Sequence, residues 1–147
     1  MLFITFLGNW KAILFFNLLI AIYLIKIKNI KLFLIIATSS LSNLFIIEPL
    51  KLLFKEPRPL NSLIIENSFS FPSGHAYSAV TFYGLLTYLL YKKYKHKYIL
   101  ILGTILIILI SYSRLYLGVH YLHDIIAGLI FGLVFLSFVI RNLLIRN

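Results

Sequence analysis

Four residues suited to acid–base or nucleophilic chemistry lie within eleven positions of one another. They are Arg114, His120, His123 and Asp124, in a chain with only four acidic residues. His120 and Asp124 are four positions apart, so on a helix they would share a face, and the carboxylate could hold one imidazole nitrogen. The other nitrogen would then act as nucleophile or base. The alternative for Asp124 is a helix N-terminal charge, and we expect His123 to be a bystander.

A second group of charged residues lies in the stretch KLLFKEPRP, residues 51 to 59. Lys51 is followed seven positions later by Arg58, which lies between two prolines. Two fixed cations suit an anion with several oxygens, although basic residues at the end of an apolar helix can also be simple interfacial anchors.

The third group is the stretch FPSGHAYSA, residues 71 to 79, directly before an apolar run. Ser73 is a candidate helix N-cap, and the free N–H groups at a helix start, such as that of Gly74, bind phosphate readily. His75 would lie beside that anion. A simple capped helix start is the alternative, but it does not explain the histidine.

Together the three groups predict phosphate chemistry without a metal or cofactor. Asp124 is the only acid among the motif residues themselves; Glu56 lies between Lys51 and Arg58, and Glu48 lies three positions before Lys51. A two-metal site would need more carboxylates, and without cysteine a thiolate zinc site is excluded.

The composition is that of a membrane protein. The mean hydropathy is +0.98, and 12% of residues are charged, against roughly 25% in soluble domains. The net charge of +10 does not indicate nucleic acid, because the basic residues punctuate apolar runs instead of forming one patch. The length of 147 residues predicts one domain, residues 1–147. The N-terminus has no features of a cleaved signal peptide, and we expect it to be mature.

Five uncharged stretches must position these groups, and they predict an all-α bundle of five transmembrane helices. Because 16 residues of helix reach only about 24 Å, short of the roughly 30 Å hydrocarbon core, each helix should extend into its polar flanks. The stretches are Ala12 to Ile25, Leu32 to Ile47, Ala76 to Tyr91, Tyr98 to Ser113 and Ile125 to Ile140.

The flanking charges predict the orientation. By the positive-inside rule, the side with most lysines and arginines is cytoplasmic, so the three polar groups should face the exterior or periplasm. Met1 to Leu7 is either interfacial or the start of the first helix. The nine basic residues on the predicted cytoplasmic side are Lys26, Lys28, Lys31, Lys92, Lys93, Lys95, Lys97, Arg141 and Arg146.

The three groups resemble, in order and spacing, the complete signature of the type 2 phosphatidic acid phosphatase family, which includes the vanadium-dependent haloperoxidases. The resemblance covers about residues 3 to 140 and rests on Lys51 with Arg58-Pro59, on Pro72-Ser73-Gly74-His75, and on Ser113-Arg114 with His120 and Asp124. Bacterial integral members commonly have six spans. We expect the span before FITFLGN to be missing here, leaving five.

The resemblance implies a role for each residue. His120 would form a phosphohistidine, with Asp124 as its orienting partner. His75 would protonate the leaving oxygen and then serve as the base for water. The phosphoryl oxygens would be held by Lys51, Arg58, Ser73, Gly74 and Arg114.

We therefore expect an enzyme of the bacterial cytoplasmic (inner) membrane that hydrolyses a lipid phosphate monoester or pyrophosphate. The resemblance implies undecaprenyl pyrophosphate, phosphatidylglycerophosphate, phosphatidic acid or lipid A 1-phosphate as substrate, and the sequence does not choose among them or fix an oligomeric state. An anion or lipid transporter with the same basic cluster is the alternative, although it would not need His120 paired with Asp124. A structural or regulatory membrane protein with a decayed site is disfavoured, because no motif position is substituted.

Overall fold

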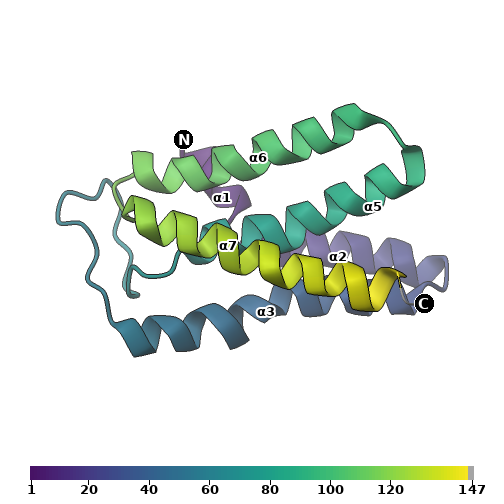
Figure 1. Ribbon diagram of the computed structural model, residues 1–147, viewed down its shortest axis with the longest axis horizontal. Helices are drawn as coiled ribbons and strands as arrows, with labels where there is room; N and C mark the ends of the chain where they lie inside the picture. Colours follow the sequence, from purple (N-terminus) through teal and green to yellow (C-terminus); the bar gives the residue numbers. More distant parts are fainter. Residues whose placement is uncertain (146–147) are drawn as a thin grey trace.

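All regular secondary structure is helical in the part of the chain that our computed structural model describes, residues 1–145 (Figure 1). No strand occurs in this range. The segments α4, η1 and α5 follow one another without interruption as one helix, and α7 continues into η2; the two η segments have π-helical turns. The elements are α1 (Leu2–Leu7), α2 (Trp10–Lys26), α3 (Ile30–Phe54), α4 (Gly74–Ser78), η1 (Ala79–Gly84), α5 (Leu85–Tyr94), α6 (Lys97–Tyr116), α7 (Leu122–Val139) and η2 (Ile140–Ile145).

Each of the five apolar stretches lies within a helical segment, so the predicted all-α class is confirmed. Among the described residues, three helices are long and apolar enough to cross a membrane: Ile30–Phe54, Lys97–Tyr116 and Leu122–Asn142. Large apolar side chains point outward along the helices, among them Phe45, which is 78% exposed. Such a surface is expected of helices that face lipid.

The connections between helices gather at the two ends of the bundle. The loop formed by residues 55–73 and the turn between α6 and α7 lie at one end, and the α2–α3 and α5–α6 connections lie at the other (Figure 1). The three motif groups therefore share one end, whereas the lysine clusters Lys26 to Lys31 and Lys92 to Lys97 occupy the opposite end. Arg141 lies in η2, and Arg146 lies outside the described residues.

Met1 to Leu7 does not extend the first long helix. Residues Leu2–Leu7 form the separate helix α1, and Asn9 caps α2 by accepting a hydrogen bond from the N–H of Lys11 at 2.9 Å. Thr5 of α1 accepts a hydrogen bond from Arg114 of α6 at 2.8 Å. The N-terminal helix therefore packs at the motif end of the bundle.

Two glycines allow the close approaches that shape this end. A Cβ atom at Gly128 of α7 would lie 2.5 Å from the carbonyl oxygen of Ser73, so only glycine lets α7 pack against the start of α4. Gly118 has a φ of +65° and turns the chain between α6 and α7, where a Cβ would lie 3.1 Å from the carbonyl oxygen of Asn61.

Candidate active site

His120 and Asp124 are in contact, but not along a helix face as the sequence analysis expected. His120 lies in the turn before α7, which begins at Leu122, and its Nδ1 lies 3.2 Å from Oδ2 of Asp124. Asp124 is in the first helical turn, and the same Oδ2 accepts a hydrogen bond from the N–H of Tyr121 at 2.9 Å. Because the first-turn carboxylate reaches back to a free backbone N–H, it meets a histidine that precedes the helix. Asp124 thus also carries the N-terminal charge that was its alternative explanation.

The neighbours of His120 determine which ring nitrogen carries the proton. Nη1 of Arg58 lies 3.3 Å from Nε2, and a guanidinium can only donate hydrogen bonds. Nε2 must therefore be the accepting nitrogen, and Nδ1–H donates to Asp124. Ser70 donates a second hydrogen bond to Oδ2 of Asp124 and helps to fix the carboxylate. The lone pair of His120 is on the nitrogen away from Asp124.

The environment keeps the His120 ring neutral. Burial lowers the pKa of His120 to about 4, and the charges of Arg58 and Arg114 act in the same direction, while the hydrogen bond to Asp124 opposes them. A neutral imidazole at physiological pH has the free electron pair that a nucleophile needs.

Arg58 ties two loops together beside His120. Its guanidinium donates to the carbonyl oxygens of Ser68 and Val119, each at 2.7 Å, and to Oγ of Ser68 at 3.0 Å. Ser68 belongs to the loop of residues 55–73, and Val119 to the turn that Gly118 permits. The N–H of Leu63 also bonds to the carbonyl oxygen of Leu117 at 2.9 Å, so the loop is fixed against this turn.

Sequence reasoning missed Glu66, which pairs with Arg114. Nη2 of Arg114 lies 2.6 Å from Oε1 of Glu66, and Nη1 donates to Thr5. Burial raises the pKa of the Glu66 carboxyl, but the hydrogen bond and charge of Arg114 and the charge of Arg58 outweigh it, so the net pKa is lowered. Arg114 is 1% exposed, and its Nε has no hydrogen-bond partner within residues 1–145. The small number of acids could have pointed to Glu66, because a carboxylate in such a basic chain is expected to pair with a cation.

Lys51 and Ser73 have local partners that agree with their predicted positions. Nζ of Lys51, near the end of α3, lies 3.2 Å from Oγ of Ser68 and 3.4 Å from Oε1 of Glu48. Ser73 is the N-cap of α4 as predicted, and its hydroxyl accepts from the N–H of Ala76 at 3.5 Å. Lys51 and Arg58 therefore both contact Ser68 of the loop. The Ser73 hydroxyl is already hydrogen-bonded as the cap of α4.

A cavity of about 590 Å³ brings most of the predicted residues together. Its polar end is lined by Lys51, Arg58, His75, Arg114 and His120, and the Gly74 backbone also borders it. Three cations and two histidines thus surround one space, together with the carboxylates of Glu48 and Glu66, and the excess of cations can bind a tetrahedral oxyanion beside a neutral imidazole. Ser73 and Asp124 lie behind this wall and do not line the cavity.

Most of the rest of the lining, here called the apolar arm, comes from α2 and α3 and consists mainly of apolar side chains, with Asn17 and Ser40 among them. The arm reaches Ala21 on α2, which lies eleven residues beyond Trp10, or about 16 Å at 1.5 Å per residue. The apolar residues that line it are Trp10, Ile13, Leu14, Leu18, Ala21, Phe33, Ala37, Leu41 and Leu44. One continuous space therefore joins the cationic end to a surface suited to hydrocarbon.

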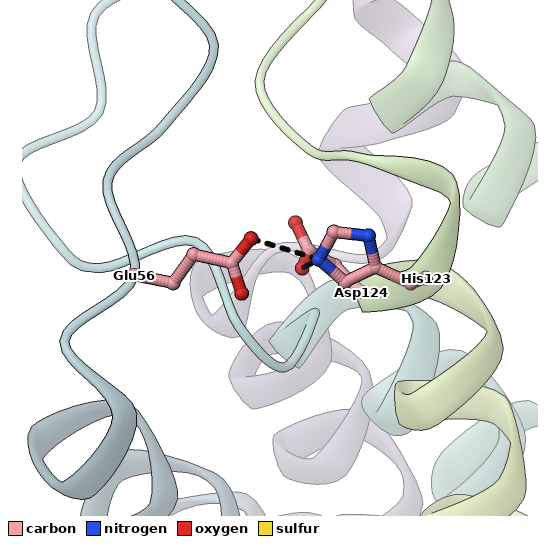
Figure 2. A group of neighbouring side chains, drawn as sticks. All are labelled: Glu56, His123 and Asp124. Atoms are coloured by element: carbon pink, nitrogen blue, oxygen red, sulfur yellow. Dashed lines mark hydrogen bonds and ion pairs between the residues drawn. The ribbon is translucent and has the colours of Figure 1, made fainter.

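His123 lies outside this cavity, as expected of a bystander. Its side chain is 58% exposed, and its Nε2 lies 2.8 Å from Oε1 of Glu56 and 3.2 Å from Oδ1 of Asp124 (Figure 2). Asp124 thus has a histidine at each of its two oxygens.

Comparison with known proteins finds one matching family and two relatives that are named as lipid phosphatases. The sequence model of the PAP2 superfamily matches residues 30–146. The chain is 39% identical over 85 residues to phosphatidylglycerophosphatase B of Bacillus subtilis (strain 168), an alignment that covers 54% of this chain and 41% of that protein. It is 43% identical over 77 residues to an undecaprenyl-diphosphatase of Sulfolobus acidocaldarius, covering 52% of this chain and 32% of the relative. The alignments thus span less than half the length of either relative.

Among solved structures, the chain matches the transmembrane PAP2-type phosphatidylglycerolphosphate phosphatase from Bacillus subtilis. The TM-score is 0.78 at 33% sequence identity, and the match covers 92% of this chain and 71% of the other. Together with the long apolar helices, this likeness shows a membrane-embedded protein.

Proposed function

Because this chain belongs to the PAP2 superfamily, we propose that it is a phosphatase that removes phosphate from a membrane lipid. The observation that carries the proposal is the lining of the cavity. Its polar end has the cations and imidazoles that phosphoryl transfer needs, and its apolar arm is lined by side chains of α2 and α3. A soluble phosphate ester would gain nothing from the arm, whereas a lipid would bury its chain there.

In the proposed reaction the phosphoryl group lies between Lys51, Arg58 and Arg114, with the Gly74 N–H at the start of the helix that Ser73 caps. On binding, Arg58 turns from Nε2 of His120 to a phosphoryl oxygen. Nε2 then attacks phosphorus, and the bond to the leaving oxygen breaks. Asp124 stabilises the positive charge that develops on the ring, because its carboxylate faces Nδ1.

His75 handles the protons in both halves of the reaction. In the first half it donates a proton to the leaving oxygen. In the second half it takes a proton from the water that attacks the phosphohistidine, so that inorganic phosphate leaves and His120 is neutral again. The presence of both His75 and His120 in the lining of one cavity supports this division.

The proposed setting is a bacterial inner membrane crossed by five helical segments: α2, α3, α4 to α5, α6, and α7 with η2. The site would face the periplasm or exterior, because the lysine clusters lie at the opposite end of the bundle. The names of the two sequence relatives support phosphatidylglycerophosphate and undecaprenyl pyrophosphate as the first candidates. Phosphatidic acid and lipid A 1-phosphate remain in the proposal.

The test is phosphate release by the purified protein in detergent from each of these four lipids, in the presence of EDTA. We expect release from at least one lipid, and none from His120→Ala with the same substrate. A protein that binds these lipids with no phosphate release would be a binding protein or transporter and would refute the proposal.

A further inference from the structure

Glu56, His123 and Asp124 form a compact group of potential metal ligands behind the proposed active site. They come from the loop after α3 and from the first turn of α7 (Figure 2). Oε1 of Glu56 is 2.8 Å from Nε2 of His123, which is 3.2 Å from Oδ1 of Asp124, and each residue offers one ligand atom within 4.8 Å of those of the other two. A tetrahedral Zn²⁺ with bonds of about 2.0 Å holds its ligand atoms about 3.3 Å apart. Small side-chain movements would bring the three atoms to this spacing.

A second observation points to a ligand at this place. Asp124 is fully buried, and its Oδ2 already faces Ser70, the Tyr121 N–H and His120. Its Oδ1, which is directed at His123, accepts no hydrogen bond from any part of the chain that the structure describes. A buried carboxylate oxygen without a donor is unfavourable, and a second carboxylate, Glu56, lies nearby. A cation between the two would stabilise both.

We propose that Glu56, His123 and Asp124 bind one divalent transition-metal ion of the Zn²⁺ type, and that its binding slows the enzyme. The imidazole favours such metals over Mg²⁺ and Ca²⁺, which prefer oxygen ligands alone. The His123 side chain is 58% exposed, so an ion can reach the site from outside the catalytic cavity. Three protein ligands leave the fourth position to water.

The link to turnover runs through Asp124. One of its oxygens would bind the metal while the other faces Nδ1 of His120. A metal on Oδ1 draws negative charge away from the carboxylate, so Oδ2 stabilises the charged ring less well. This effect on rate rests on the proposed function, whereas metal binding itself does not.

The experiment uses the full chain in detergent, purified without a polyhistidine tag and freed of metal with EDTA, which is then removed. Zn²⁺ binding is measured by calorimetry, and Co²⁺ is added as a spectroscopic probe of the ligand set. The variants are His123→Asn and Glu56→Gln. His96→Asn is the matched control, since His96 is also an exposed histidine beside a helix start, but lies at the other end of the bundle. Gel filtration and thermal unfolding establish that each variant is folded.

We expect the wild type and His96→Asn to bind one equivalent of Zn²⁺, and His123→Asn and Glu56→Gln to bind it about tenfold more weakly or worse. Phosphate release, relative to each protein's own metal-free rate, should fall on Zn²⁺ addition only in the first two. Binding that is equal in His123→Asn, or lost in His96→Asn, would overturn the site. Binding without a change in rate would overturn the regulatory effect, as would equal inhibition of His123→Asn, because the metal would then act on the substrate. Since calorimetry needs no turnover, failure of the phosphatase assay leaves the test of the site intact.

Discussion

Nη1 of Arg58 lies 3.3 Å from Nε2 of His120, so a cation covers the ring nitrogen that we propose as the nucleophile. The same guanidinium is fixed by the carbonyl oxygens of Ser68 and Val119. Arg58 therefore holds the loop of residues 55–73 at the site and is positioned to turn to a bound phosphoryl group.

Replacement of Arg58 by lysine should lower kcat by roughly 10² to 10³, the usual effect of losing one donor to a transition-state oxyanion. Lysine keeps the charge but lacks the planar fork that reaches several acceptors. Steady-state phosphate release measures the effect, with Lys55→Ala, an exposed cation of the same loop, as control. Unchanged kcat in Arg58→Lys would mean that the site needs only a positive charge at this position.

The low pKa of His120 should appear in the pH profile. Protonation removes the lone pair of Nε2, so kcat/KM should fall on the acid side near pH 4, where the buried ring titrates, and not near the ordinary value of 6.5. Arg58→Ala should move this fall to higher pH, because the charge of Arg58 lowers the pKa of His120. A fall that disappears in Glu66→Gln would assign it to that carboxyl instead.

The same shift affects stability. The unfolded state takes up a proton on His120 at higher pH than the folded state does, so the free energy of unfolding should decrease as the pH falls from about 6.5 towards 4. Thermal unfolding of the wild type and of His120→Gln across this range would measure the contribution, which should be missing from the variant.

Glu66→Gln should lower kcat/KM by about tenfold or more, because a hydrogen bond to a charged group is worth roughly 1.5 to 3 kcal/mol. Glu66 holds Nη2 of Arg114, and Thr5 holds Nη1. Thr5→Val is the partner in a double-mutant cycle measured by phosphate release. If the two changes act through the position of Arg114, their effects will be non-additive; strict additivity would contradict a shared role.

Replacement of His120 and replacement of His75 should affect the hydrolysis of different substrates differently. His120→Ala should abolish turnover of every lipid, because no other group can form the covalent intermediate. His75→Ala should slow the hydrolysis of phosphate monoesters by roughly 10² to 10⁴. It should slow the first step with a pyrophosphate lipid much less, since the leaving group of that lipid is already stable.

With the base for water also missing, the phosphoenzyme of His75→Ala should persist. Rapid-quench labelling with a terminally ³²P-labelled pyrophosphate lipid would detect it as acid-labile, base-stable label. Label on His120→Ala, or equal slowing of the first step for both substrate types in His75→Ala, would refute the assigned roles.

The proposed orientation can be tested directly because the chain has no cysteine. Ser62 and Lys93 are both exposed and lie at opposite ends of the bundle. In intact cells, an impermeant thiol reagent should label Ser62→Cys and not Lys93→Cys. The reverse pattern would place the site on the cytoplasmic face.

The sequence by itself determined the class of the fold and most of the residues at the cavity. Long apolar stretches can form only helices in a membrane, and the charged residues between them must lie at the helix ends. Lys51, Arg58, His75, Arg114 and His120 could therefore be predicted to meet at one end, as they do in the cavity.

Only the tertiary structure decided how these residues are held. Glu66 meets Arg114 across 48 positions, and Thr5 meets it across 109. Ser70 reaches Asp124 from a loop without any periodic pattern. The path of such a loop is set by the surfaces that it packs against and not by its own residues, so spacing along the chain does not predict its contacts.

The contact between His120 and Asp124 illustrates both contributions. Their spacing predicted that they meet, but His120 precedes the helix, and Asp124 reaches it by turning back to the N–H of Tyr121. Where α7 begins depends on the turn at Gly118 and on the close packing of Gly128 against Ser73. The spacing fixed the partners, and the packing of the helix start fixed their geometry.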